Sequence, residues 1–257
     1  MTRLANKVAL ITGGGAGIGA ATARLFCAEG AAVTLVDSDM NALMRTSDAI
    51  RLEIPNAKVI YHTADVANTV QSDIAVQKTI DAFGELNILI NNASMRNYTA
   101  LANVTSDEWQ AMIGVNLIGT SNYCRAALPE LRKTEHASIV NVSSCYAVKG
   151  RKGMGLYDAT KAGQLAITRT LAFEEACNGV RVNAICPGST MTEFHVDRAH
   201  ANGKSIDKLK TERKETSMLG RWASPSEIAW PILWLASSEG SFITGAALMV
   251  DGGLSAM

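Results

Sequence analysis

The sequence lacks an excess of charge of either sign. Its 257 residues include 24 Lys and Arg against 24 Asp and Glu, which gives a formal net charge of zero. A protein that binds nucleic acid or an anionic membrane surface usually carries a clear positive excess. We therefore expect no nucleic acid and no membrane among its partners.

Patterns typical of disulfides and of metal sites are also missing. The cysteines are odd in number and scattered, with no C-x-x-C pair: Cys27, Cys124, Cys145, Cys177 and Cys186. His195 and His200 are five positions apart, so they do not share a helical face, and no Cys or carboxylate pair stands at ligand spacing. We expect no metal, and reduced, buried thiols in a cytoplasmic protein.

Long apolar runs are absent as well, and we expect neither a signal sequence nor an interdomain linker. The most apolar stretch, Ala229–Ala236, is far below the roughly 20 residues of a membrane-spanning helix. Residues 1–7 are polar and leave no room for a hydrophobic signal core. With 47% hydrophobic and 19% charged residues, the sequence predicts one globular domain over residues 1–257.

Short β-rich runs alternate along the chain with longer helix-like segments. The strand candidates are Val8–Thr12, Ala32–Val36, Lys58–His62, Ile88–Asn91, Ser138–Val142, Val180–Ile185 and Ala246–Val250. Several are apolar throughout, as expected when helices cover both faces of a parallel sheet. The sequence therefore predicts an α/β fold of three layers, with a doubly wound parallel sheet of seven strands.

Local signals mark two helix starts and one break in this rhythm. Thr105 with Glu108, and Ser224 with Glu227 behind Pro225, match the S/T-x-x-E capping box. The segment Ser189–Leu219 is polar and weakly periodic, which predicts a long loop. We expect this segment to act as a lid that closes over bound substrate and excludes water.

A glycine-rich turn follows the first strand and precedes a helix-like segment. The turn runs from Thr12 to Gly19 and includes Gly13, Gly15, Gly17, Ile18 and Gly19. Glycines permit a tight turn and let a dinucleotide's pyrophosphate approach the backbone N–H groups at the positive end of a helix. The turn therefore predicts an anion site.

An acidic residue at the end of the second strand bears on the choice of cofactor. Asp37 stands eighteen positions beyond Gly19, where a carboxylate can accept hydrogen bonds from adenosine ribose hydroxyls and repel a 2′-phosphate. No Lys or Arg stands among the glycines to neutralise such a phosphate. We expect NAD(H) rather than NADP(H); the alternative is that Asp37 only caps the next turn.

A hydroxyl, a phenol and an ammonium group follow the fifth strand. Ser144 closes that strand, Tyr157 lies thirteen residues further on, and Lys161 is four residues beyond Tyr157. On a helix this spacing places Tyr157 and Lys161 on one face, where the ammonium favours an ionised phenol. Tyr157 would then exchange a proton with an alcohol or ketone while Ser144 orients the substrate oxygen.

These motifs together resemble the short-chain dehydrogenase/reductase family over almost the whole chain, from Val8 to Gly253. The motifs that carry the resemblance are T-G-x-x-x-G-I-G (Thr12–Gly19), Asp65-Val66, Asn91-Asn92-Ala93, Asn116, Ser144, Y-x-x-x-K (Tyr157 and Lys161), Pro187-Gly188 and Val250-Asp251-Gly252-Gly253. The resemblance implies a Rossmann-like single domain that forms a homotetramer or a homodimer.

The resemblance also implies roles for individual residues. Asn116, Ser144, Tyr157 and Lys161 would form the catalytic set, with Asn116 holding a backbone carbonyl and a water on a proton path from Lys161. Further cofactor contacts would come from Asp65, Val66, Asn92, Ala93, Lys161, Tyr157, Pro187, Gly188, Thr190 and Thr192. The chain departs from the family pattern at Ser94, where glycine is usual, and at Thr190, where an aliphatic residue is common.

Three functions remain open at the level of sequence. The first is an NAD(H)-dependent oxidoreductase that moves a hydride between the cofactor and a secondary alcohol or ketone. A second is a 3-oxoacyl-thioester (acyl-carrier-protein) reductase, and a third is a cofactor-binding scaffold or sensor without turnover. Arg151 and Lys152, between Ser144 and Tyr157, are either receptors for an acidic substrate group or simply solvated.

Overall fold

The computed structural model describes residues 2–212 and 217–257, and these form a sheet between two layers of helices. The sheet has seven parallel strands in the order β3-β2-β1-β4-β5-β6-β7. The strands are β1 (Val8–Thr12), β2 (Ala32–Asp37), β3 (Val59–Thr63), β4 (Ile88–Asn91), β5 (Ser138–Val142), β6 (Arg181–Pro187) and β7 (Ala247–Val250). The predicted fold class is confirmed, and each predicted strand overlaps an observed one.

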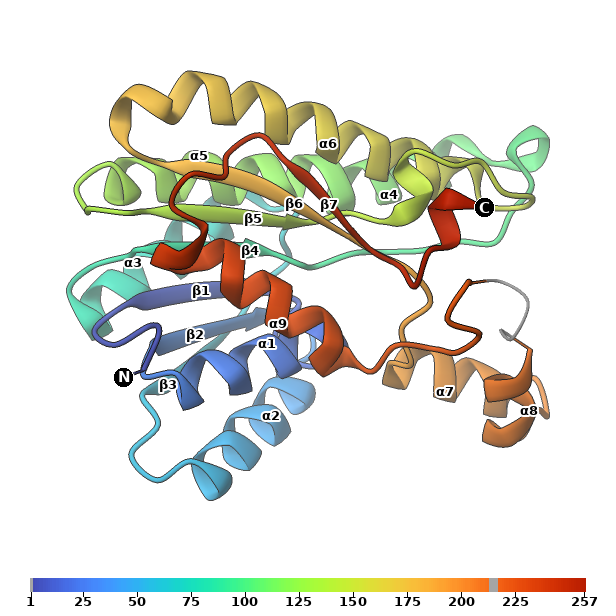
Figure 1. The fold of residues 1–257 in the computed structure, drawn as a ribbon, viewed down its shortest axis with the longest axis horizontal. Helices are drawn as coiled ribbons and strands as arrows, with labels where there is room; N and C mark the ends of the chain where they lie inside the picture. The colour runs from blue at the N-terminus through green and yellow to red at the C-terminus, as the bar shows by residue number, and fades with distance from the viewer. Residues whose placement is uncertain (1, 213–216) are drawn as a thin grey trace.

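Helices follow the strands and cover both faces of the sheet. They are α1 (Gly17–Ala28), α2 (Met40–Glu53), α3 (Thr69–Phe83), α4 (Ser106–Ile113), α5 (Gly119–Leu131), α6 (Gly155–Glu175), α7 (Glu193–Ala201), α8 (Ile206–Thr211) and α9 (Pro225–Ala236). In Figure 1, α1, α2 and α9 lie below the sheet, whereas α5 and α6 lie above it.

Two apolar cores match these two layers. On one face Phe26 of α1 and Ile232 of α9 pack with Ile11 of β1, and on the other Tyr123 of α5 packs with Leu10 of β1. Consecutive strand residues point to opposite faces, so a strand covered on both sides is buried along its whole length. All five residues of β1 and of β5 are accordingly buried.

Both predicted capping boxes are present. The Thr105 hydroxyl accepts from the Glu108 N–H while the Glu108 carboxylate accepts from the Thr105 N–H, at the start of α4. Ser224 and Glu227 make the same exchange at the start of α9, with Pro225 at the first helical position. Each box satisfies two N–H groups that a helix start would otherwise leave unpaired.

The segment Ser189–Leu219 differs from its predicted form. It contains α7 and α8, which Figure 1 shows beyond the end of the sheet, outside both helical layers. The prediction of a loop was wrong because α7 buries only Ala199 and α8 buries only Leu209, which leaves too few apolar positions for a helical period. Residues 213–216 of the expected lid lie outside the described residues.

Candidate active site

The predicted site residues meet at one edge of the sheet. In a parallel sheet all strands end at the same edge, and ligands bind in the crevice outside those ends. Two adjoining hollows lie there, and both are lined by Ile18, Asn92, Ser94, Arg96 and Thr192. We call them the Tyr157 pocket, which Ser144, Tyr157 and Lys161 line, and the glycine-turn groove, which Gly13, Gly17 and Asp37 line.

The glycine turn forms a cradle that larger side chains would fill. Gly13 has φ +62°, and a Cβ there would come within 2.7 Å of Asn92 Nδ2. A Cβ at Gly19 would collide with the Gly13 carbonyl oxygen. The N-terminus of α1 opens onto this groove, and the N–H groups and positive dipole of a helix start suit a phosphate. One of these groups, the Gly17 N–H, donates to Glu193 Oε2 at 2.9 Å. The turn therefore fits a dinucleotide's pyrophosphate.

Asp37 lies against this cradle at the end of β2. Its Oδ2 accepts from the Gly15 N–H at 3.1 Å and its Oδ1 accepts from the Asp39 N–H at 3.2 Å. Asp37 also lines a further hollow with Asp65, Val66 and Ala93, which continues the glycine-turn groove. The carboxylate is thus held where a ligand in the groove would meet it.

Tyr157 and Lys161 share one face of α6 and both are buried. The Lys161 Nζ lies 5.6 Å from the centre of the Tyr157 ring. It donates to the Val142 carbonyl at 2.8 Å and to Gln164 Oε1 at 3.0 Å. Burial, with a smaller effect of nearby Arg96, lowers the pKa of Lys161 to about 7.

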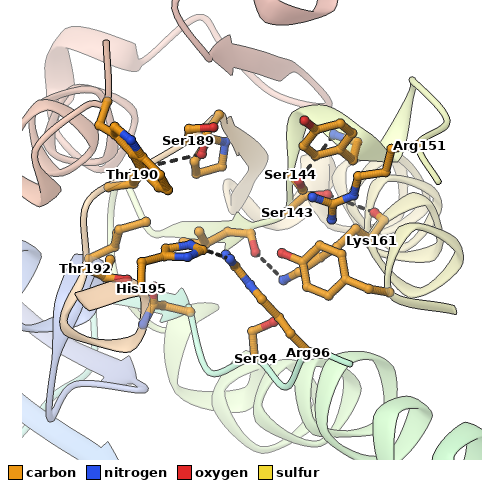
Figure 2. A pocket seen from close by; sticks show the side chains of 18 residues that line it. Ser94, Arg96, Ser143, Ser144, Arg151, Lys161, Ser189, Thr190, Thr192 and His195 are labelled. Carbon is orange, nitrogen blue, oxygen red and sulfur yellow. Dashed lines mark hydrogen bonds between the residues drawn. The ribbon is translucent and has the colours of Figure 1, made fainter. Parts of the chain in front are cut away.

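The end of β5 brings two serines to the same pocket. The Ser143 hydroxyl donates to the Lys161 carbonyl at 2.8 Å, which ties α6 to the strand. The Ser144 hydroxyl oxygen accepts from the Tyr146 N–H at 3.2 Å. Figure 2 shows Ser144, Arg151 and Lys161 on one side of the pocket and Thr190, Thr192 and His195 across from them.

Asn116 lies behind the pocket rather than in its wall. It sits in a π-helical turn, Gly114–Ile118, between α4 and α5, and is fully buried. Its Nδ2 donates to the Met95 carbonyl at 3.0 Å and its Oδ1 accepts from the Met95 N–H at 2.8 Å. Single π-turns inside α-helices often mark functional sites. Here the turn aims an amide at the backbone after β4.

The remaining predicted cofactor residues divide between these hollows. Pro187, Gly188, Thr190 and Thr192 line the Tyr157 pocket, and Asn92 lines both hollows. Gly15 and Gly19 line none of these three hollows. They lie inside the glycine turn and contribute to its shape. Ser94, where the resemblance leads us to expect glycine, is not among the described non-glycine residues with a positive φ, so its backbone does not require glycine.

Sequence reasoning missed two residues of this site, Gln164 and Arg96. Gln164 Nε2 donates to the Asn116 carbonyl at 2.9 Å, so its amide links that carbonyl to Lys161. Arg96 lines the Tyr157 pocket, and its Nη1 lies 2.9 Å from His195 Nε2. For Gln164 a signal existed, since it continues the helical stripe of Tyr157 and Lys161 at positions i, i+4 and i+7.

Two predictions about single side chains need adjustment. Arg151 lines the Tyr157 pocket, but it pairs with Asp158 at 3.0 Å and stacks over Tyr146, whereas Lys152 is exposed and does not line it. Cys177 is exposed, so the expectation of buried thiols was wrong for that residue and correct for the other four. Its place after α6, in a short turn, explains the exposure.

Residues 2–212 and 217–257 lack two features that would point to other functions. No helix in these ranges combines the length and apolar character needed to cross a membrane. The same ranges contain no group of three or more His, Cys, Asp and Glu side chains arranged to hold a metal ion.

Comparison with known proteins gives matches over nearly the full chain. A family profile described as "Enoyl-(Acyl carrier protein) reductase" matches residues 13–255. The chain is 36% identical to the 3-oxoacyl-[acyl-carrier-protein] reductase FabG of Thermotoga maritima, over 98% of this chain and 99% of that protein. It is 34% identical to the meso-2,3-butanediol dehydrogenase of Serratia marcescens, over 99% and 96%.

A solved structure agrees closely as well. The NADPH-bound structure of a short chain oxidoreductase from Pseudomonas aeruginosa PAO1, described as containing an atypical catalytic center, superposes with a TM-score of 0.93. The two chains are 32% identical, and the match covers 99% of this chain and 98% of the other.

Proposed function

Because the chain belongs to the short-chain dehydrogenase/reductase family of oxidoreductases, which bind a nicotinamide cofactor, we propose that it interconverts a secondary alcohol and a ketone with NAD(H). One observation carries the proposal. Ser144, Tyr157 and Lys161 line the same pocket as Ile18 and Asn92, which also line the glycine-turn groove. A substrate in that pocket would meet both a proton donor and the cofactor.

The bound nicotinamide ring supplies the hydride acceptor or donor. In oxidation the substrate carbon loses a hydride, and Tyr157 accepts the hydroxyl proton; in reduction Tyr157 returns a proton to the developing alkoxide. Ser144 orients the substrate oxygen through its hydroxyl. Lys161 lies beside the phenol, with its Nζ 5.6 Å from the centre of the Tyr157 ring, and carries hydrogen-bond donors for a ribose hydroxyl. Asn116 keeps the backbone after β4 in place.

Asp37 supports NAD(H) over NADP(H). Its carboxylate faces the groove, where it would accept from ribose hydroxyls and repel a 2′-phosphate. Gly13, Gly15, Gly17, Ile18 and Gly19 would hold the pyrophosphate. Asp65, Val66, Asn92 and Ala93 would border the adenosine side, and Pro187, Gly188, Thr190 and Thr192 the nicotinamide side.

We also propose two larger features. The segment Ser189–Leu219 would close over substrate, since Thr190, Thr192 and His195 already form one wall of the Tyr157 pocket. A homotetramer or homodimer would form through α5 and α6, between which a groove includes Leu128 and Ile167. Phe173 on α6 is 89% exposed, an unusual state for a large apolar side chain.

The alternative of a 3-oxoacyl-thioester reductase has one specific support. The relative from Thermotoga maritima carries that name and is matched over 98% of this chain. Asp37 argues against it, because such reductases commonly use NADPH. A binding protein without turnover is the third possibility, and the presence of Ser144, Tyr157 and Lys161 in one pocket argues against it.

A panel assay decides among these functions. The purified protein is mixed with polyols, hydroxy acids, dihydrodiols, sterols and a 3-oxoacyl thioester, and the absorbance of the reduced cofactor is followed with NAD(H) and NADP(H). We expect turnover of a secondary alcohol or ketone with NAD(H), and Asp37→Ala should reduce the preference for NAD(H) over NADP(H). Turnover of the thioester with NADPH alone would support the reductase, and cofactor binding without any turnover the scaffold.

A further inference from the structure

The Tyr157 pocket carries an excess of positive charge. Its described lining includes Arg96, Arg151 and Lys161 and contains no Asp or Glu. Arg151 is balanced from outside the lining by Asp158, which accepts from its Nε and Nη2 at 3.1 and 3.0 Å. Burial favours the neutral form of Lys161. Arg96 is therefore the cation that needs an explanation.

Arg96 lies in the wall of the Tyr157 pocket, beside the proton donor. Its guanidinium carbon is 5.2 Å from the centre of the Tyr157 ring and 5.7 Å from that of Phe194, both within cation–π range. Figure 2 shows it between the wall of Ser144 and Lys161 and the wall of His195. A molecule whose oxygen reaches the Tyr157 hydroxyl would also be in reach of this guanidinium.

Arg96 is half-buried and has no carboxylate partner among residues 2–212 and 217–257. No ion pair in these ranges involves it. Its charge faces the phenols of Tyr157 and Tyr98 and the ring nitrogen of His195 instead. A partly buried cation is costly unless an anion pairs with it, and a guanidinium offers parallel N–H donors that match a carboxylate or phosphate.

We propose that Arg96 binds an anionic group of the substrate, so that the enzyme acts on short hydroxy acids and the corresponding oxo acids. The inference rests on the proposed function and names its substrate class. The alcohol oxygen lies at Tyr157 and the carboxylate at Arg96, and the short distance between these groups limits the carbon skeleton between them. The reaction itself is unchanged: the substrate carbon gives a hydride to the cofactor, and the substrate hydroxyl gives a proton to Tyr157.

The cofactor also carries anionic groups, its phosphates, that Arg96 could bind. Arg96 also lines the glycine-turn groove with Gly13 and Gly17, so its partner could be a cofactor phosphate. The guanidinium carbon lies 5.2 Å from the centre of the Tyr157 ring, which places the charge beside the proton donor and favours the substrate. The NADH affinity of an Arg96 variant separates the two sources.

The test compares matched substrates that differ in charge. Values of kcat/KM are measured with NAD for 3-hydroxybutyrate and its neutral isostere 3-hydroxybutyramide, in the wild type and in Arg96→Met and Arg96→Lys. We expect Arg96→Met to lose roughly 100-fold on the anion and little on the amide, with partial recovery in Arg96→Lys. Lys152→Met removes an exposed cation outside the pocket and should change neither value.

Binding measurements keep the proposal separate from the proposed function. By calorimetry the NADH-loaded wild type should bind 3-hydroxybutyrate more tightly than the amide, and Arg96→Met should lose that difference without a change in NADH affinity. Equal losses on both substrates, or equal affinities, would overturn the role of Arg96 and leave the oxidoreductase intact. Weaker NADH binding with unchanged substrate preference would assign Arg96 to the cofactor instead. If no substrate turns over, the proposed function fails, and calorimetry alone decides on Arg96.

Discussion

At the scale of single residues, the burial of Lys161 has the clearest physical consequence. The side chain is 1% exposed and is held by the Val142 carbonyl and the Gln164 amide oxygen. Two neutral acceptors do not replace the hydration of an ammonium group, so burial lowers its pKa from the ordinary value of 10.5 to about 7. The cofactor-free enzyme therefore gains a group that titrates near neutral pH.

This shift predicts a dependence of stability on pH. Between pH 7 and about 10.5 Lys161 is neutral in the folded protein and protonated in the unfolded chain, so the unfolded state binds more protons. Its contribution to the free energy of unfolding therefore rises with pH across this window and is least favourable below pH 7. Urea unfolding of the cofactor-free wild type and of Lys161→Met at several pH values measures it. From pH 7 to pH 10 the free energy of unfolding of the wild type should rise relative to that of Lys161→Met. A difference in free energy that does not change with pH would refute the buried-lysine account.

Residue types with a fixed spacing were predictable, and residues joined only by the tertiary fold were not. The i, i+4 spacing of Tyr157 and Lys161 and the position of Ser144 at a strand end lead from sequence to one pocket. Arg96 stands in a segment without helix or strand, 61 positions before Tyr157 in the chain. No local pattern indicates which way its side chain points.

At the scale of elements, α7 contacts the very group that should bind a cofactor phosphate. Glu193 Oε2, in the first turn of α7, accepts from the Gly17 N–H at 2.9 Å. Gly17 is the first residue of α1, where the N–H groups and the helix dipole favour an anion. The Glu193 carboxylate therefore accepts from the N–H group that would otherwise donate to a pyrophosphate.

We expect the substitution Glu193→Gln to tighten NADH binding. It removes the negative charge that competes with the pyrophosphate at Gly17, an effect of roughly two- to fivefold in the dissociation constant for one exposed charge at a helix end. A calorimetric titration of NADH measures it, and Asp197→Asn, a second exposed acid of α7 outside the groove, is the matched control. Unchanged or weaker binding in Glu193→Gln alone would show that the contact does not compete with the cofactor.

The elements themselves were predictable where one strong signal fixed them. Capping boxes marked the starts of α4 and α9, and an apolar run marked a buried strand such as β1. The helices α7 and α8 show no such signal in the sequence. Each contributes few apolar residues to their small core, and Trp222 and Met191, which lie outside both helices, complete it. The π-turn around Asn116 could not be predicted either, because an extra residue within a helix does not change the amino-acid composition in a recognisable way.

At the scale of the whole molecule, the parallel sheet explains why distant segments form one site. The glycine turn follows β1, Asp37 ends β2, Asn92 follows β4 and Ser144 follows β5. Parallel strands place all these ends at one edge of the sheet. The parallel topology alone therefore brings the phosphate cradle and the proton donor side by side. This arrangement could be predicted from the order of the motifs alone.

One labelling experiment tests the central claim, that the Tyr157 pocket transfers a hydride between the cofactor and a substrate carbon. NADH carrying deuterium at the reactive ring carbon is incubated with the enzyme and a ketone from the panel, and the alcohol is analysed by mass spectrometry and NMR. We predict one deuterium on the carbinol carbon, with product formation reduced roughly 100-fold or more in Tyr157→Phe. Alcohol without deuterium at that carbon, or full turnover in Tyr157→Phe, would contradict the account.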